Sequence, residues 1–292
     1  MTIAIVAKVN VEGAFVAVSD RMVSWSDQIP AAENITKHFS LGKHWWAMYA
    51  GDVCESLPII ERARCNWHEL ADAALEAEIA KRGAPYQPPE HNSRLESREI
   101  IETAFCRAYQ TRVAELIVGK YLARYGISSV DEFRQSGHAQ FGDHVFSRLC
   151  DKIDEFDLGI DFIVYGFSSG GRSQIFEVTN PGFSTDRNAL RYWAVGSGQL
   201  MALASLTSRE FQQASIPEVT YRLCEAKFCA ETASGVGKDT LVVVTNRHGQ
   251  EAVISFDEDI DRLRSIWKRT HVAEPVEAVE LIKERLPSHL NW

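Results

Sequence analysis

Apolar residues run almost without interruption through two short segments at the start of the chain. The segments are "IAIVAKV" at 3–9 and "AFVAVSD" at 14–20, and Gly13 stands between them. Short apolar runs bounded by turn residues are typical of strands, and a glycine favours the tight turn that joins two antiparallel strands. The pattern therefore predicts a hairpin. Two further strand-like runs follow at 35–41 and 44–52.

A long helical pattern begins directly after these four predicted strands. Residues 53–83 show helical periodicity, which ends at a glycine and the proline-rich "APYQPPE". The pattern resumes over 93–126, where Ser93 or Ser97 can cap the first turn and Gly126 can end the last one. Shorter helical pieces follow. The middle of the chain is thus predicted to be helical.

Strand-like and helical patterns then return together in the second half of the chain. The glycine turn "SSGG" joins the first two of the later strands, and the segment "AVGSG" leads from a strand into an apolar helix. We expect strands at 161–167, 173–180 and 191–198, helices at 199–206 and 217–230, strands at 240–246 and 252–256, and an acidic helical tail.

The order of these elements indicates the fold class. Blocks of strands and blocks of helices favour α+β layering over the regular βαβ alternation of a doubly wound sheet. The simplest arrangement is a four-layer αββα sandwich of two stacked antiparallel sheets, which would bury the first strand. No repeat or flexible linker interrupts the chain. We therefore expect one domain over residues 2–292, with an enlarged helical segment at 84–156.

Charge and cysteine usage exclude several classes of function. The net charge is −9 and no basic tract occurs, which argues against a nucleic-acid partner. The six cysteines lack CxxC spacing, so neither a zinc site nor a disulfide framework is indicated, and we expect no metal and no cofactor. The first apolar run does not resemble a signal peptide, and no run approaches the ~20 apolar residues of a membrane span. We expect a cytoplasmic protein without a membrane partner.

The second residue of the chain is a candidate nucleophile. A threonine hydroxyl needs an adjacent base, and a free α-amine on the same residue can be that base, since its reference pKa is about 7.7–8.0. Removal of Met1 would give Thr2 such an amine. A threonine at the second position is, taken alone, an ordinary accident of residue usage. Whether Thr2 is a nucleophile therefore has to be judged together with the other polar positions of the chain.

Six further positions fall at predicted strand ends and turns. Each has an ordinary interpretation when taken singly, as a turn residue, a helix cap or a solvated lysine. Their joint order along the chain resembles the proteasome β-subunit family of N-terminal-nucleophile hydrolases, over about residues 2–55 and 160–250. The positions are Asp20 in "VAVSDR", Lys37 in "ITKHFS", Gly51 in "AMYAGD", Ser197 in "AVGSG", and Glu231 and Ser234 in "CAETASGVG".

The resemblance implies a role for each of these residues. Thr2 would be the nucleophile through its hydroxyl and the base through its amine. Lys37, on the third strand, would lower the pKa of the hydroxyl, and Asp20 would pair with Lys37 and keep it protonated. The Gly51 N–H would donate to the oxyanion, an interaction worth roughly 3 kcal/mol in other acyl-transfer enzymes. The hydrogen-bonded shell around the amine would consist of Ser197, Glu231 and Ser234.

Three features depart from the family pattern. Many members begin with two threonines, and an alignment on Ile3 would place Met1 at the position of the nucleophile. We favour the alignment on Thr2, which resembles the bacterial ancestral-beta-subunit branch and lengthens the first hairpin by two residues, so that every side chain keeps its face. Glu231 stands where the family usually has aspartate. The helical segment at 84–156 is longer than in most members and suits subunit packing or a cap over the site.

The resemblance favours one function and leaves two alternatives open. The leading interpretation is a threonine peptidase or amidase that cleaves peptides through an acyl-enzyme, assembles with itself into a ring or spiral, and has a possible ATP-dependent unfoldase as partner. A catalytically silent structural subunit of such an assembly is the first alternative. A peptide ligase that uses the same acyl-enzyme is the second, and it would need an amine acceptor site that the sequence does not show.

Overall fold

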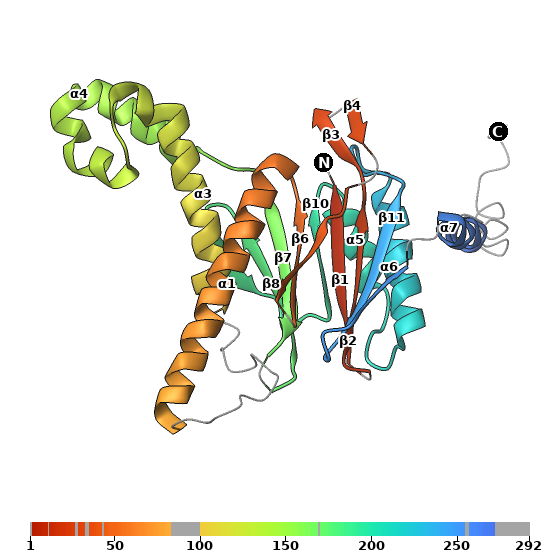
Figure 1. Cartoon of the computed structure of the whole chain (residues 1–292). Coiled ribbons are helices and arrows are strands. Elements are labelled where there is room, and N and C mark those ends of the chain that lie inside the picture. Colours follow the sequence, from red (N-terminus) through yellow and green to blue (C-terminus); the bar gives the residue numbers. More distant parts are fainter. Residues whose placement is uncertain are drawn as a thin grey trace, which may run out of the picture.

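Two five-stranded sheets, each antiparallel throughout, form the centre of the protein (Figure 1). Helices cover the outer face of each sheet. The predicted strand blocks thus form two stacked sheets in an α+β sandwich. The structure is a computed structural model, and it describes residues 2–10, 12–26, 29–32, 35–42, 44–82, 100–168, 170–254 and 257–271.

The first sheet holds the N-terminal strand in an interior position. Strand β1 (Ile3–Val9) pairs with β2 (Ala14–Asp20) on one side and with β10 (Tyr192–Gly196) on the other. All seven residues of β1 are buried. Strand β11 (Thr240–Asn246) lies beside β2, and β12 (Glu251–Ile254) forms the edge. A neighbour on each side holds β1 in place, which terminal segments generally lack.

The second sheet is built from strands on both sides of the helical middle of the chain. Strands β3 (Val23–Ser26) and β4 (Ile29–Ala32) form a separate two-stranded sheet. In the sequence they lie between β2 and the first strand of the second sheet. In spatial order, the strands of the second sheet are β5 (His38–Gly42), β6 (Trp45–Ala50), β7 (Asp161–Phe167), β8 (Ser173–Thr179) and β9 (Phe183–Asp186).

The helices fall into two groups, one for each sheet. Helices α1 and α3 cover the second sheet, α5 and α6 cover the first, and α4 projects beyond the sheets (Figure 1). The first group is α1 (Val53–Arg82), η1 (Ile100–Cys106), α3 (Arg107–Ile117), η2 (Val118–Leu122), η3 (Ala123–Tyr125) and α4 (Val130–Asp154). The second group is α5 (Gln199–Thr207), α6 (Ile216–Ala230) and α7 (Asp257–His271).

Alternating side chains of the central strands create the layers. In β1, Ile3 and Ile5 pack against α5 and α6, whereas Ala4 and Val6 face the second sheet. In β6, Trp46 points toward the first sheet, while the residues on the other face of β6 pack against α1 and α3. Since successive side chains of a strand point to opposite faces, one buried strand contributes to two cores. The result is four layers, in the order helices, sheet, sheet and helices.

The hydrophobic pattern placed most element boundaries correctly. The predicted ranges 3–9, 14–20, 161–167 and 240–246 are confirmed as β1, β2, β7 and β11, and α1 ends at Arg82. None of the described helices carries an apolar run with the length and hydropathy of a membrane span.

Other expectations need correction or cannot be compared. The strand predicted at 35–41 begins only at His38, so Lys37 precedes β5 and lies on no strand, and β5 is the fifth strand in the chain. The short strands β3, β4 and β9 were not predicted, because four residues are too few to establish a period. In the predicted helical segment, the described part is helical from 100 to 125 and from 130 to 154, with a kink at Gly142, whose φ of 68° is not helical. Ser93, Ser97 and residues 84–99 and 272–292 lie outside the described residues.

Candidate active site

Thr2 lies directly before β1, where the chain enters the first sheet. The residue is 2% exposed. Gly196 of β10 packs against it so closely that a Cβ atom on Gly196 would lie 2.2 Å from the Thr2 carbonyl oxygen and 3.0 Å from the Ala50 Cβ atom. Its φ of 107° also favours glycine at this position. The last residue of β6, Ala50, thereby comes close to the candidate nucleophile.

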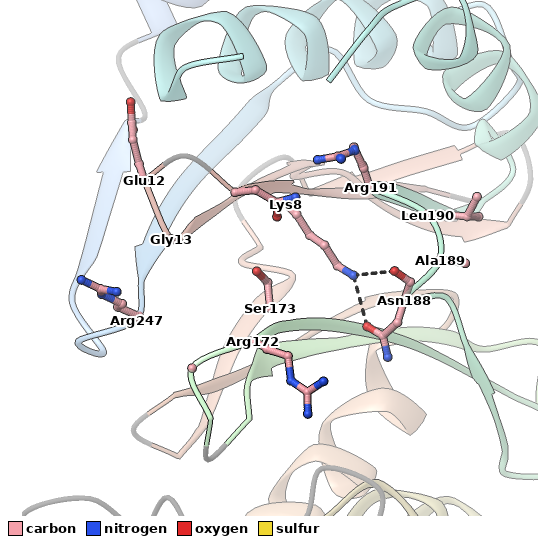
Figure 2. Close-up of a pocket in the computed structure, with 12 residues that line it drawn as sticks. Lys8, Glu12, Gly13, Arg172, Ser173, Asn188, Ala189, Leu190, Arg191 and Arg247 are labelled. Atoms are coloured by element: carbon pink, nitrogen blue, oxygen red, sulfur yellow. Dashed lines mark hydrogen bonds between the residues drawn. The ribbon is translucent and has the colours of Figure 1, made fainter. Parts of the chain in front are cut away.

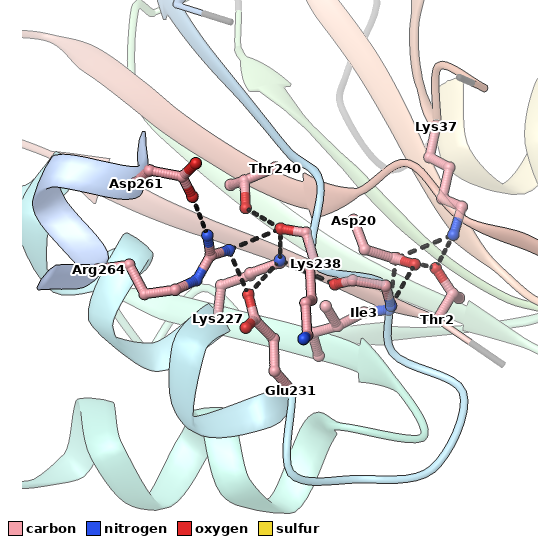
Figure 3. A network of polar contacts seen from close by, with 11 residues as sticks. Thr2, Ile3, Asp20, Lys37, Lys227, Glu231, Lys238, Thr240, Asp261 and Arg264 are labelled. Atoms are coloured by element: carbon pink, nitrogen blue, oxygen red, sulfur yellow. Dashed lines mark hydrogen bonds and ion pairs between the residues drawn. The ribbon is translucent and has the colours of Figure 1, made fainter. Parts of the chain in front are cut away.

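Asp20, the last residue of β2, organises the surroundings of Thr2. Its side chain is completely buried. The Oδ1 atom accepts hydrogen bonds from the Thr2 hydroxyl, from the Ile3 N–H at 2.9 Å and from Lys37 Nζ at 2.8 Å. The Oδ2 atom accepts from the Gly237 N–H at 3.2 Å (Figure 3). A carboxylate with four donors is held in one orientation, because every rotation would break several of these bonds.

Lys37 completes a contact triangle with Thr2 and Asp20. The residue is 1% exposed, and its Nζ atom donates both to Thr2 Oγ1 and to Asp20 Oδ1 (Figure 3). Desolvation by burial lowers the pKa of Lys37 below its ordinary value, although the charge and the hydrogen bond of Asp20 act in the opposite direction. The predicted pairing is therefore present. Asp20 favours the protonated form of Lys37, as expected, but the effect of burial on the Lys37 pKa is larger and opposite.

The two predicted serines meet beside the Thr2 backbone. Ser197 Oγ lies 3.4 Å from the Thr2 carbonyl oxygen and 3.3 Å from the Ser234 carbonyl oxygen, and its single proton can be donated to either. Both distances exceed the range of about 2.5–3.0 Å that is usual for O–H···O bonds, so each contact is weak. The structure thus brings Ser197 and the Ser234 backbone to the residue that would carry the free amine.

Glu231 is placed differently from the prediction. It follows α6 and accepts hydrogen bonds from Lys227 Nζ at 2.5 Å and from Arg264 at 2.9 Å. Among the described residues, no hydrogen bond joins Glu231 to Thr2. Lys227 also donates to the Gly237 carbonyl oxygen at 2.8 Å (Figure 3). Glu231 therefore reaches Asp20 only indirectly, through Lys227 and the Gly237 backbone.

Lys227 is a residue of this network that the sequence reasoning missed. It is completely buried, and its three ammonium hydrogens have three acceptors, on Glu231, Gly237 and Lys238. The sequence does contain a signal. Lys227 stands four residues after Leu223 and three before Ala230, on the apolar stripe of α6. A lysine on such a stripe indicates a buried partner.

Gly51 follows β6 and has a φ of 126°. A Cβ atom at this position would lie 2.4 Å from the Gly159 carbonyl oxygen, so a side chain is excluded here. Its neighbour Ala50 is close to Gly196 and hence to Thr2. The role of the Gly51 N–H as oxyanion donor stays a prediction.

Comparisons with models of known protein families and with curated proteins found no match. Within the described part of the chain, no group of three or more His, Cys, Asp and Glu side chains is arranged to hold a metal ion. The chemistry of the site is therefore argued from Thr2, Asp20 and Lys37 themselves.

Proposed function

We propose that the protein is an N-terminal threonine hydrolase of the proteasome β-subunit type, with the corresponding αββα fold, and that it cleaves peptide bonds after removal of Met1. The observation that supports this proposal best is the position of Thr2 Oγ1 between Lys37 Nζ and the Asp20 carboxylate. A hydroxyl in contact with a cation is easier to deprotonate, because the developing alkoxide is stabilised.

The proposed reaction proceeds in two steps. Thr2 Oγ1 forms a bond to the carbonyl carbon of the substrate, and its proton passes to the free Thr2 amine, while the charged Lys37 stabilises the developing alkoxide. The Gly51 N–H stabilises the oxyanion, and the peptide C–N bond breaks as the leaving amine takes up the proton. Water then attacks the acyl ester on Thr2 Oγ1, which releases a carboxylic acid and restores the hydroxyl.

The decisive experiment compares two threonine variants. The Thr2→Ala variant should lose hydrolysis of fluorogenic peptide amides by at least about a thousandfold, while its folding stays intact, because a residue before the first strand contributes little to the core. Thr111→Ala removes a hydroxyl from an exposed position on α3 and is the matched control. Full activity of Thr2→Ala would show that the nucleophile lies elsewhere.

A catalytically silent subunit is the second candidate, and two observations favour it. Thr2 is 2% exposed, and Glu231 is engaged by Lys227 and Arg264 instead of the N-terminal residue. Intact mass separates the two functions. Loss of one methionine mass makes Thr2 competent, whereas retention of Met1 together with absent peptidase activity assigns the silent role.

Self-association is part of the proposal. Leu200 and Met201 on α5 are 78% and 51% exposed, which is unusual for large apolar side chains next to each other. Light scattering should show an assembly at micromolar concentration, and a single species of 32.8 kDa would contradict it. An unfoldase partner remains an expectation from the resemblance.

A further inference from the structure

A second concave site lies at the other end of the sandwich from Thr2. Thr2 precedes β1 and Lys8 stands near its end, so six residues of extended strand, roughly 20 Å, separate the two regions. The cavity there has a volume of about 520 Å³. It is lined from the first sheet, from the turn between β7 and β8, and from the segment before β10 (Figure 2).

The cavity concentrates positive charge in a chain that is acidic overall. Four cationic side chains and a single carboxylate, that of Glu12, line it, although the chain has a net charge of −9. The four cations come from parts of the chain that are far apart in the sequence, so local composition does not explain their meeting. They are Lys8, Arg172, Arg191 and Arg247.

Two of these cations form no ion pair within the part of the chain that the structure describes. Lys8 is 5% exposed and donates only to the neutral side-chain and backbone oxygens of Asn188, at 3.2 and 3.1 Å (Figure 2). Among the described residues no carboxylate forms an ion pair with Lys8. The Nη1 atom of Arg191 is buried and has no hydrogen-bond partner within the same described part. Buried cations of this kind are costly unless an anion compensates them.

We propose that this cavity binds a small polyanion that carries phosphate groups. Arginine and lysine are the side chains that recognise phosphate, and four of them match a ligand with several negative charges. Ser173 and Asn10 add neutral hydrogen-bonding groups to the lining. The apolar lining is small, with Ala189 and Leu190 as its largest part, so the ligand is highly polar and not an aromatic or lipid molecule.

Calorimetric titration of the full chain with inorganic pyrophosphate at low ionic strength tests this proposal. We expect saturable binding at one site per chain. Arg172→Glu and Arg247→Glu should each weaken it at least tenfold, and these exposed positions leave the fold intact. Arg262→Glu makes the same charge change on α7, where the side chain is 83% exposed, and should alter the affinity less than twofold.

Lys8→Met should weaken the binding at least tenfold, since it removes the buried ammonium. If that variant does not fold, the two arginine variants decide the matter alone. Absence of saturable binding would overturn the proposal, and so would equal weakening by all three arginine variants, which would indicate non-specific attraction. A polyglutamate peptide that binds more tightly than pyrophosphate would also overturn it, in favour of an acidic protein segment. None of these results depends on peptidase activity.

Discussion

A buried lysine lies near each end of β1, and the two lysines have different partners. At the Thr2 end, Lys37 meets the Asp20 carboxylate at 2.8 Å. At the far end, Lys8 forms no ion pair among the described residues and donates to the neutral oxygens of Asn188, and burial lowers its pKa to about 8. A paired cation is part of a completed network, whereas an unpaired one among three arginines is suited to a ligand that brings the missing charge. The comparison separates a polar network that is completed within the protein from a cavity that we propose binds an anion.

The largest expected difference between the two ends is in stability and activity. Lys37→Met should destabilise the fold by about 3–5 kcal/mol, because it leaves Asp20 as an unpaired buried carboxylate. The same substitution should lower peptide hydrolysis by orders of magnitude. Lys8→Met leaves only neutral acceptors behind and should cost about 1 kcal/mol or less. Urea unfolding of both variants measures the two losses of stability. Equal losses would contradict the proposed difference between the paired Lys37 and the unpaired Lys8.

A buried histidine next to Lys37 makes the stability of the fold depend on pH. His38 is 7% exposed, contacts the Tyr165 hydroxyl at 2.6 Å, and has its pKa lowered by burial to about 4. Between about pH 6.5 and 4 the unfolded chain binds a proton that the folded chain does not, so stability falls as the pH drops through this window. The loss amounts to about 3 kcal/mol.

Urea unfolding at several pH values measures the His38 effect. The difference in stability between the protein and its His38→Gln variant should shrink as the pH falls from 6.5 to 4. His138→Gln replaces an exposed histidine on α4 and serves as the control. Parallel stability curves for the protein and the His38 variant would contradict the assignment.

The smallest expected effect concerns the pH dependence of anion binding at the Lys8 end. Burial and, to a smaller extent, Arg191 lower the pKa of Lys8 to about 8, against the raising effect of Asp186. Arg172, Arg247 and Glu12 complete the charged lining. An anion favours the charged lysine, so affinity should be highest below pH 8 and fall about tenfold above it, as roughly one charge contact is lost.

Inorganic sulfate is the appropriate probe for that measurement, because its own charge stays constant across the range. Lys8→Arg keeps the charge at every pH and should bind sulfate with a flat profile. A flat profile for the unmodified protein as well would assign the affinity to the arginines and remove Lys8 from the site.

Much of the candidate site could be predicted because its residues stand at strand ends. Asp20 closes a strand whose apolar run is plain in the sequence, and the register of a buried hairpin is fixed by that run. Its proximity to Thr2 follows from the antiparallel pairing. Lys37 was expected on a strand but precedes β5, because the run "ITKHFSL" pairs with β6 only from His38 onward.

The placement of Glu231 could not be predicted in the same way. Its position relative to Thr2 depends on the side chain of Lys227, which the helical pattern hides among apolar residues, and on Arg264 from a helix far along the chain. Lys227 and Arg264 therefore decide which partners the Glu231 carboxylate contacts, because opposite charges attract over several ångströms.

The sequence by itself determined the layers of this protein. Continuous apolar runs specify strands that are buried on both faces, and the block order of strands and helices specifies which helices cover which sheet. Only the tertiary structure decided the electrostatics. The pairing of Lys37 with Asp20, the absence of an ion pair for Lys8 among the described residues, and the meeting of Arg172, Arg191 and Arg247 depend on distances between residues far apart in the sequence. Hydrophobic burial follows local periodicity, whereas the free energy of a charge depends on everything within several ångströms of it.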